Sequence, residues 1–439
     1  MKKIDYNKKI LITNSFFSVI SRIIGMIMAM ISAPLLLHLL GNEKYGIWVT
    51  LLSIVSWIYT FDFGIANGLR NKLTECLATN KESEARKYLG TAYFLLGLAS
   101  FTIFFLIAII IYFCDITLIL NMHIDNESLE TVLLVAVFFA CVNFTISLVR
   151  QVFYALQRSA LDSIANTSAQ IAFTFVLYVL SKCQLSFLII VAVAEGVMQM
   201  AKNIISSLYV FYQNHGLFFS LTDIDKKYAG GILSFGLQMF IVQIAALILN
   251  TTDNLIISHY LGAKEVTPYS ICYKYFGMIE SVYVAVFTPF MGAYTAAYAR
   301  RDIAYINRLV RRNIFGYIIF ALGIIFAGYI FKPFAYLWLG QDLGYAQWLI
   351  PLTALYFAML MFTHVFSCVL AAFSMIREVT FAVVLEAIVN IPISVYCAVN
   401  LEMGTVGVIV GSLASMIIAV IVFPTKAILV LWRINKEYN

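Results

Sequence analysis

The sequence predicts an all-α, polytopic membrane protein with twelve transmembrane helices. Of its 439 residues, 62% are hydrophobic and only 12% are charged, whereas a typical soluble domain carries about 25% charged residues. The mean hydropathy is +0.90. Because a helix needs about 20 predominantly apolar residues to cross a bilayer, the apolar runs divide into twelve spans and no segment is left for a sizeable soluble domain.

The predicted helices follow one another along the whole chain and are separated by short polar segments. They are expected at residues 10–35, 46–66, 89–113, 131–153, 164–181, 187–212, 231–256, 265–289, 313–331, 348–373, 379–399 and 406–430. The longer ones, such as 187–212, are expected to tilt or to protrude from the bilayer.

The basic residues between the helices predict the orientation. Most of them fall in alternate connecting segments: Lys2, Lys3, Lys8, Lys9; Arg70, Lys72, Lys81, Arg86, Lys87; Arg150, Arg158; Lys226, Lys227; Arg300, Arg301, Arg308, Arg311, Arg312; Arg377; Lys426, Arg433, Lys436. The longest intervening segment, 114–130, is acidic and has no Lys or Arg. By the positive-inside rule both termini are predicted to be cytoplasmic. The formal net charge of +6 suits anionic lipid of the inner leaflet rather than nucleic acid.

An internal repeat predicts two six-helix bundles. The sequence His-Leu-Leu-Gly at 38–41 recurs as His-Tyr-Leu-Gly at 259–262, an offset of 221 residues. The halves are predicted as 1–212 and 213–439. Because six is an even number, the two halves have the same orientation, so the repeat axis is expected along the membrane normal and a substrate site near the midplane between the halves.

Charged residues lie within or at the ends of the apolar runs. They are Arg22, Lys202, Lys274, Asp62, Glu195, Glu280 and Glu386. On insertion scales a charge at the centre of a span costs about 2.5–3.5 kcal/mol. We therefore expect these side chains to line a polar, partly cationic chamber, which indicates transport of an anionic substrate.

Three local motifs then allow comparison with a known family. They are Asp-Phe-Gly-Ile-Ala-Asn-Gly-Leu-Arg-Asn at 62–71, Thr-Asp-Asn-Leu-Ile-Ile-Ser at 252–258 and Asn-Ile-Pro-Ile-Ser at 390–394. With them the chain resembles, over nearly its whole length, the O-antigen and polysaccharide flippases of the multidrug/oligosaccharidyl-lipid/polysaccharide (MOP) exporter superfamily.

The resemblance implies a MATE/MOP-like fold and the translocation of an undecaprenyl-diphosphate-linked oligosaccharide. Transport would run from the cytoplasmic to the outer leaflet of the bacterial inner membrane by alternating access. The partners implied are this substrate, the lipid bilayer and polysaccharide polymerase machinery, with no nucleic acid. No cofactor is expected, although a proton or sodium gradient would couple transport.

Such a substrate needs cations for its diphosphate and a polar wall for its glycan. We predict diphosphate binding by Arg22, Lys202 and Lys274, with Arg22 favoured because a guanidinium binds a phosphate in a bidentate fork. Glu195, Gln199 and Lys202 are spaced i, i+4 and i+7, so they share a helix face and are predicted as the polar wall of the chamber. The alternatives are an Arg22 bound by neighbouring carbonyls and a Glu–Lys pair that only packs.

The predicted helix 265–289 carries an aromatic stripe. Tyr269, Tyr273, Phe276 and Tyr283 lie on one face with Glu280, and they are predicted to contact sugars. The alternative is that these aromatic side chains pack in the core or form an interfacial belt.

Two further groups of residues are predicted to act in coupling or gating. The candidates for ion coupling are Glu195, Glu280, Glu386 and Asp62. The candidates for gating or helix capping are Asp62, Asn67, Arg70, Asp253 and Asn254. His364, alone in its helix, is interpreted as a core histidine.

Two other function classes compete. A MATE-like exporter of drugs or organic cations would favour an acidic chamber, whereas this chain mixes both signs of charge. A polysaccharide polymerase or ligase would have a large outside loop, whereas the longest here is 114–130. The sequence shows no nucleotide-binding loop, metal cluster or triad spacing, so we predict a transporter, not an enzyme, with no catalytic and no metal-binding residues.

Overall fold

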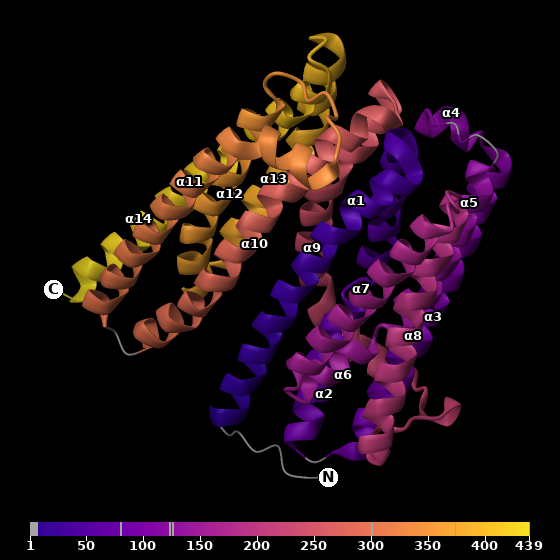
Figure 1. The fold of residues 1–439 in the computed structure, drawn as a ribbon. Coiled ribbons are helices and arrows are strands. Elements are labelled where there is room, and N and C mark those ends of the chain that lie inside the picture. Colours follow the sequence, from indigo (N-terminus) through magenta and orange to yellow (C-terminus); the bar gives the residue numbers. More distant parts are fainter. Residues whose placement is uncertain are drawn as a thin grey trace. The chain divides into compact units, whose positions relative to one another are not determined.

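The computed structural model describes residues 8–438 apart from 80, 123, 125–126, 300–301 and 374. Every regular element in this part of the chain is a helix (Figure 1). The elements are α1 (Lys8–Thr60), α2 (Ile65–Ala78), α3 (Glu82–Phe113), α4 (Ile116–Leu120), α5 (Leu129–Ile146), α6 (Val149–Ala155), α7 (Ser159–Lys182), α8 (Leu188–Gln213), η1 (His215–Leu217), η2 (Leu221–Asp223), α9 (Lys226–Leu261), α10 (Ala263–Ala299), α11 (Ile303–Leu339), α12 (Leu349–Ala372), α13 (Ile376–Val395), η3 (Tyr396–Asn400) and α14 (Gly404–Tyr438).

Each predicted span corresponds to a helix of the structure, so the all-α fold class is confirmed. The first two spans together form α1, which breaks at Gly41, where φ is 75°. Glycine adopts this left-handed conformation without the steric penalty of a side chain. The fourth span is divided between α5 and α6, and the eleventh between α13 and η3.

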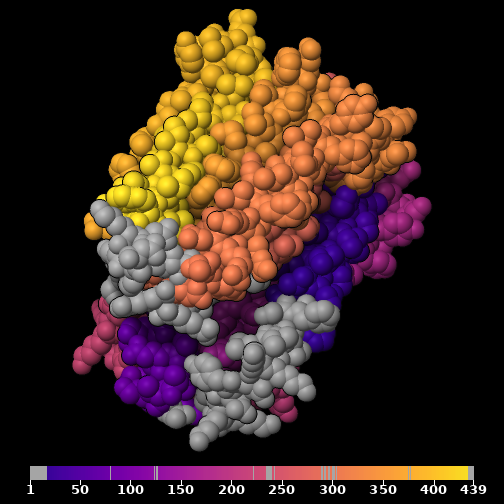
Figure 2. Space-filling view, turned by 90° about the vertical axis from the view of Figure 1, so that its left-hand side faces the viewer, coloured from indigo at the N-terminus to yellow at the C-terminus, as the bar shows by residue number. Residues whose placement is uncertain are grey.

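The outward faces of the long helices are apolar. Within the described residues nine helices are long and apolar enough to cross a membrane. On α11 the side chains of Leu322, Ile325 and Tyr329 are 62%, 66% and 87% exposed, and in Figure 2 this helix lies at the surface in orange. Apolar surface on this scale is stable only in contact with lipid, so the chain is a multi-pass membrane protein.

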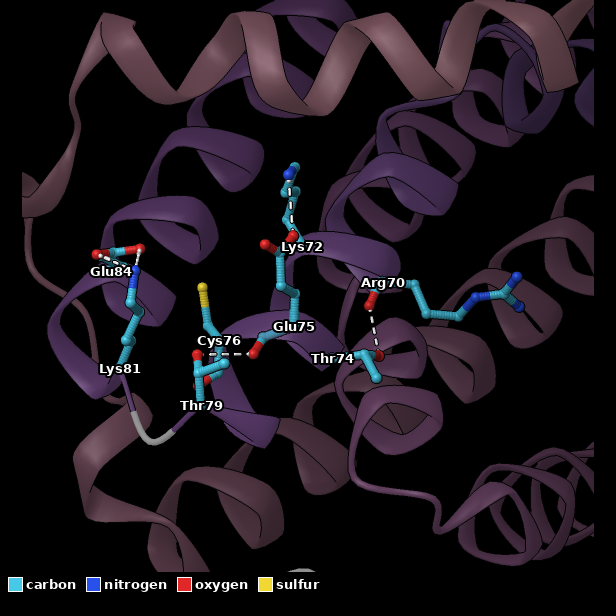
Figure 3. A network of polar contacts seen from close by, with 8 residues as sticks. All are labelled: Arg70, Lys72, Thr74, Glu75, Cys76, Thr79, Lys81 and Glu84. Atoms are coloured by element: carbon cyan, nitrogen blue, oxygen red, sulfur yellow. Dashed lines mark hydrogen bonds and ion pairs between the residues drawn. The ribbon is translucent and has the colours of Figure 1, made fainter.

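The segment 67–88 between the second and third predicted spans is expected from the sequence to be a connecting loop, but it contains most of α2. This helix is amphipathic: Leu69, Leu73 and Leu77 are buried, while Lys72 and Glu75 form an exposed ion pair of 2.9 Å (Figure 3). Its apolar residues are too few to span a membrane, but their 3.6-residue period is sufficient for a helix on the surface of a bundle. The predicted loop 290–312 is likewise largely helical, since α10 extends to Ala299 and α11 begins at Ile303.

The chain forms two compact units, Met1–Ile244 and Ala245–Asn439, and their boundary lies within α9. The first part of α9 packs on the N-terminal unit, where a Cβ at Gly68 would lie 2.0 Å from the carbonyl oxygen of Ile232. The rings of Tyr88 and Tyr228 are 4.7 Å apart. The predicted halves divide the chain after 212, whereas these contacts place the first part of α9 with the N-terminal unit.

Glu127 anchors the first turn of α8 from a distant segment. Its carboxylate, only 5% exposed, accepts hydrogen bonds from the backbone amides of Leu188 and Ile189, both at 2.9 Å, and lies 3.2 Å from the ammonium of Lys44. The first amides of a helix have no partner within the helix, so this carboxylate replaces a cap that the local sequence lacks.

We predict that Glu127→Ala lowers the free energy of unfolding by about 2–3 kcal/mol, because buried charge-assisted hydrogen bonds are lost and their donors are left unpaired. The measurement is the thermal midpoint of the purified protein in detergent. Glu43→Ala, which removes an exposed carboxylate close to Lys44 in the chain, is the matched control and should leave the midpoint unchanged. Equal midpoints for the two variants would contradict the anchoring role.

Candidate functional site

The three residues predicted as a polar wall line one cavity of the N-terminal unit. Glu195, Gln199 and Lys202 project from α8 into a space of about 340 Å³ that is also lined by α1, α5, α6 and α7. The ammonium of Lys202 donates to Asn166 Oδ1 on α7 and to Gln199 Oε1, each at 2.9 Å. These oxygens partly solvate the charge inside the bundle, as a charged group within a membrane protein requires.

A pair of buried asparagines fixes α8 in this cavity. Asn203 Nδ2 donates to Asn143 Oδ1 at 3.1 Å, and Asn143 Nδ2 donates to the carbonyl oxygen of Gly196 at 3.1 Å. Both side chains are almost fully buried. Helices α5 and α8 are in close contact at Gly196, where a Cβ would lie only 2.3 Å from the ring of Phe139 on α5. Amide hydrogen bonds between helices hold bundles together in lipid, so the polar face of α8 has a fixed direction.

A second cavity, of about 310 Å³, adjoins the first. It contains three of the residues predicted for gating, Asp62, Asn67 and Arg70. The residues that line both cavities are Tyr59, Ser147 and Arg150. The predicted wall residues and three of the predicted gate residues therefore line adjoining cavities of one unit.

Asp62 shapes the start of α2. Its carboxylate accepts from the amides of Gly64 at 2.8 Å and Ala66 at 3.1 Å. Asp62 lies two residues before the N-cap position, Gly64, and its bond to Ala66 satisfies an amide in the first turn that has no partner within the helix. Phe63 and Gly64 have positive φ values of 48° and 74°, so the chain turns sharply here. The turn directs Arg70 towards the second cavity, and Figure 3 shows its guanidinium pointing away from the Lys72–Glu75 pair.

Arg150 is a residue that the sequence analysis interpreted only as an orientation signal. It is the second residue of α6, lines both cavities, and has a half-exposed side chain whose Nε lies 3.9 Å from Asp162 Oδ1. At that distance it forms a weak ion pair and not a hydrogen bond. The two cavities together contain Arg70, Arg150 and Lys202 against Asp62 and Glu195, so their formal charge is positive. No local sequence signal distinguishes Arg150 from the other basic residues at helix ends.

Arg22 lines neither of these two cavities. It is exposed on α1, in a segment that packs on α7 through small residues: Ser18 Oγ and Ser163 Oγ are 2.8 Å apart, and Thr167 donates to the carbonyl of Ser21 at 2.7 Å. Its predicted diphosphate contact is outside the cavities described here and stays a prediction.

The C-terminal unit contains a buried polar network centred on Asp253. Tyr269 donates its hydroxyl to Asp253 Oδ2 at 2.5 Å, and Ser412 donates to the same carboxylate at 3.2 Å. Asn390 Nδ2 donates to Ser412 and Ser415 at 3.0 and 3.3 Å. The network links α9, α10, α13 and α14.

The predicted capping role of Asp253 is therefore wrong. Asp253 and its neighbour Asn254 lie inside α9, which continues to Leu261, where backbone amides are already bonded within the helix. The carboxylate instead accepts hydrogen bonds from side chains of other helices.

Most of the predicted sugar-contacting stripe lies in the core. Tyr269, Phe276 and Tyr283 are at most 2% exposed, and the ring of Phe276 stacks 6.0 Å from that of Phe331. The packing alternative accounts for these three in this structure, and their contact with sugars stays a prediction that no contact described here supports. Tyr273 is less buried, and its hydroxyl lies 3.5 Å from Asn250 Oδ1.

The charged candidates of the C-terminal unit have different environments. Glu386, on α13, is 5% exposed. Glu280, on α10, contacts His364 Nε2 of α12 at 3.1 Å, a partner that the sequence analysis interpreted as an isolated core histidine. Lys274 lies half-buried on α10 and lines neither cavity of the N-terminal unit.

The helical arrangement is shared with membrane transporters of known structure. The structure is similar to the inward-facing conformation of a multidrug resistance MATE family transporter of the MOP superfamily, with a TM-score of 0.75 at 13% identity, covering 95% of this chain and 99% of that one. It is also similar to a MOP superfamily transporter from Pyrococcus furiosus Vc1 (DSM3638), with a TM-score of 0.62 at 14% identity and 99% of both chains covered. The chain thus has the MOP superfamily transporter fold.

The family follows from the sequence match. Residues 11–295 match the model described as polysaccharide biosynthesis protein, and the chain belongs to this family. A putative O-antigen transporter of Salmonella typhimurium is 22% identical over 411 residues, which is 91% of this chain and 92% of that protein. A putative O-antigen export protein of Yersinia pseudotuberculosis is 21% identical over 427 residues, with 91% of each covered. The resemblance inferred from the motifs is confirmed.

Proposed function

We propose that this protein is a flippase that moves an undecaprenyl-diphosphate-linked oligosaccharide, such as a repeat unit of O-antigen or a related surface polysaccharide. Transport runs from the cytoplasmic to the outer leaflet of the bacterial inner membrane. It proceeds by alternating access and is coupled to an ion gradient. The names of the relatives and the transporter fold support the class.

The observation that carries the proposal is the pair of adjoining cavities in the N-terminal unit, whose walls carry cationic and other polar side chains. A lipid-linked oligosaccharide has a polar glycan that must avoid the lipid, a diphosphate that needs cations, and a polyprenyl tail that can stay in the bilayer. The cavities offer amide and hydroxyl groups together with Arg70, Arg150 and Lys202. In a medium of low dielectric constant, fixed cations offset the cost of a phosphate dianion.

We assign the diphosphate contacts to Lys202 and Arg150. Arg70, which lines the second cavity, is a further cation near them. Arg150 offers a planar fork that matches phosphate oxygens, and Lys202 a point charge. Arg22 and Lys274 are kept as further diphosphate contacts on sequence grounds alone. Arg22→Lys should then retain partial transport, and Arg22→Ala should lose it at normal abundance.

A second candidate function is export of drugs or organic cations, favoured by the structural similarity to a multidrug MATE transporter. The positive formal charge of the two cavities opposes it, because like charge in a desolvated site repels a cation by several kcal/mol. A polymerase or ligase is disfavoured by the named relatives, which are transporters.

The test is deletion of the gene combined with reconstitution. The deletion strain should accumulate a lipid-linked oligosaccharide on the cytoplasmic leaflet, and the purified protein in liposomes should translocate that same material. Accumulation without reconstituted transport of the purified lipid, or transport of organic cations instead, would overturn the proposal.

Two native cysteines test the proposed orientation. Cys114, at the end of α3, and Cys183, at the end of α7, are both exposed, whereas Cys76 on α2 is buried. With both termini in the cytoplasm, a membrane-impermeant maleimide added to whole cells should label the protein, and Cys114→Ser with Cys183→Ser should remove the label. Labelling only after the cells are opened would reverse the orientation.

A further inference from the structure

An acid–base pair joins two helices in the C-terminal unit. His364 Nε2 lies 3.1 Å from Glu280 Oε1. His364 is within α12, one of the candidate spans, and Glu280 is in the middle of α10. An ionisable side chain at membrane depth is costly and generally marks a functional pathway.

The pair is accessible compared with the other intramembrane carboxylates. The side chains of His364 and Glu280 are 38% and 17% exposed, whereas Glu386 and Asp253 are 5% and 4% exposed. A group that exchanges protons with water must be reachable, so accessibility favours this pair over the two sealed carboxylates.

The surrounding helices offer no described ion pair that competes with His364 for Glu280. Two tyrosines of α10, Tyr273 and Tyr283, interact electrostatically with Glu280. They interact in turn with Tyr317 on α11, Tyr356 and Cys368 on α12 and Asp253 on α9. Tyr356 also interacts with Glu386 on α13. Between Gly404 and Thr425, α14 has no ionisable side chain. Lys274 lies six residues before Glu280 on α10, which turns it about 240° around the helix.

Histidine is the side chain whose charge ordinarily changes between pH 5 and 8. A neutral imidazole beside an ionised carboxylate gives the pair a charge of −1. One proton taken from water converts it to an imidazolium–carboxylate pair of zero net charge. Since a net charge is costly at membrane depth, proton binding changes how readily this part of the unit is buried or opened to water.

We propose that His364 and Glu280 form the binding site for the proton that couples transport. This inference rests on the proposed flippase function, which requires an ion gradient but does not identify the ion. The pair would take up a proton from water on one side of the membrane and release it to water on the other. No other chemical bond changes.

The first experiment measures proton binding without substrate. Infrared difference spectra of the protein in liposomes are recorded between pH 8 and pH 5. We expect a protonation signal that disappears in Glu280→Gln and moves to a different pH in His364→Gln. Ser281→Ala, a neighbour whose hydroxyl bonds back to Gly277 O at 2.8 Å, is the matched control and should retain the signal. A signal unaltered by Glu280→Gln and His364→Gln would overturn the proposal.

The second experiment measures coupling with the lipid-linked oligosaccharide purified from the deletion strain. For one coupled proton, a gradient of one pH unit should shift the translocation equilibrium about tenfold in the wild type. In Glu280→Gln and His364→Gln the gradient should have no effect, whereas in Glu386→Gln it should act as in the wild type.

The outcomes separate the two proposals. Wild-type translocation whose response to the gradient survives in Glu280→Gln, or is lost only in Glu386→Gln, overturns the proton site and leaves the flippase function intact. A lower thermal midpoint with an unchanged pH response means that the pair only ties α10 to α12, which also overturns it. If the wild type translocates nothing, the flippase proposal fails, and the infrared signal still decides whether the pair binds a proton.

Discussion

Changing Arg150 to glutamate is expected to lower the rate of translocation at least about a hundredfold, because a charge-assisted phosphate contact contributes about 3 kcal/mol. Arg150 lines both cavities of the N-terminal unit. The change reverses the formal charge of the two cavities from positive to negative, so the substrate diphosphate would meet repulsion along the whole polar space. Arg150→Lys keeps the charge but loses the fork, and should retain partial transport.

The measurement is the initial rate of translocation in liposomes, corrected for the amount of folded protein. Arg158→Glu is the matched control, because Arg158 lies at an exposed position, bonds to Gln213 at 3.2 Å and lines neither cavity. Lys202→Glu should resemble Arg150→Glu. Normal rates for both of these, together with a lost rate in Arg22→Glu, would move the diphosphate site away from the two cavities.

Changing Asp253 to alanine should have the largest effect on stability, a loss of about 2–5 kcal/mol, because buried donors left without an acceptor cost about 1–3 kcal/mol each. The hydroxyls of Tyr269 and Ser412 both donate to this carboxylate, and all three side chains are at most 4% exposed. Asp253→Asn keeps one acceptor oxygen and the same volume, so its loss should be smaller.

The thermal midpoint of the purified protein and its abundance in the membrane are the two readouts. Asp342→Ala removes an exposed aspartate of the same unit, whose carboxylate accepts only from the amide of Gly344 at 3.0 Å among the described contacts. It should leave the midpoint unchanged. A stable Asp253→Ala protein would show that the network of α9, α10, α13 and α14 contributes little to the fold.

These predictions assign different roles to the two units. The N-terminal unit has two cavities whose lining residues carry a positive formal charge, which suits an anionic headgroup. The C-terminal unit has a sealed network around Asp253 and an accessible pair at Glu280 and His364, which suit support and coupling respectively. Variants of the cavity residues should change the translocation rate without changing stability. Variants of the Asp253 network should lower stability.

The stripe on α8 lines a cavity, whereas most of the stripe on α10 lies in the core. Both stripes have helical spacing, and both carry a glutamate. The difference is composition: Glu195, Gln199 and Lys202 are all polar, so burial against apolar helices would cost each of them its hydration. Tyr269, Phe276 and Tyr283 gain from burial, and their periodicity is the same whether the stripe faces a core, a cavity or lipid.

The environments of Arg150 and His364 could not be predicted from the sequence. In the sequence Arg150 is one of many basic residues near helix ends, and all of them fit the positive-inside rule equally well. His364 has no ionisable neighbour at helical spacing on α12 other than Cys368. Each of these residues contacts a partner on another helix. Glu280 and His364 are separated by 84 residues in the chain.

The sequence by itself determined the membrane class, the helical architecture and the family. Hydropathy and charge are properties of short stretches of the chain, and they decide which stretches cross the bilayer and in which direction. Only the tertiary structure decided which charged side chains share a cavity, that Asp253 lies in a sealed network and that Glu280 meets His364. Those outcomes depend on which helix faces pack together, and packing is fixed by the joint fit of several distant segments rather than by the period of any one of them.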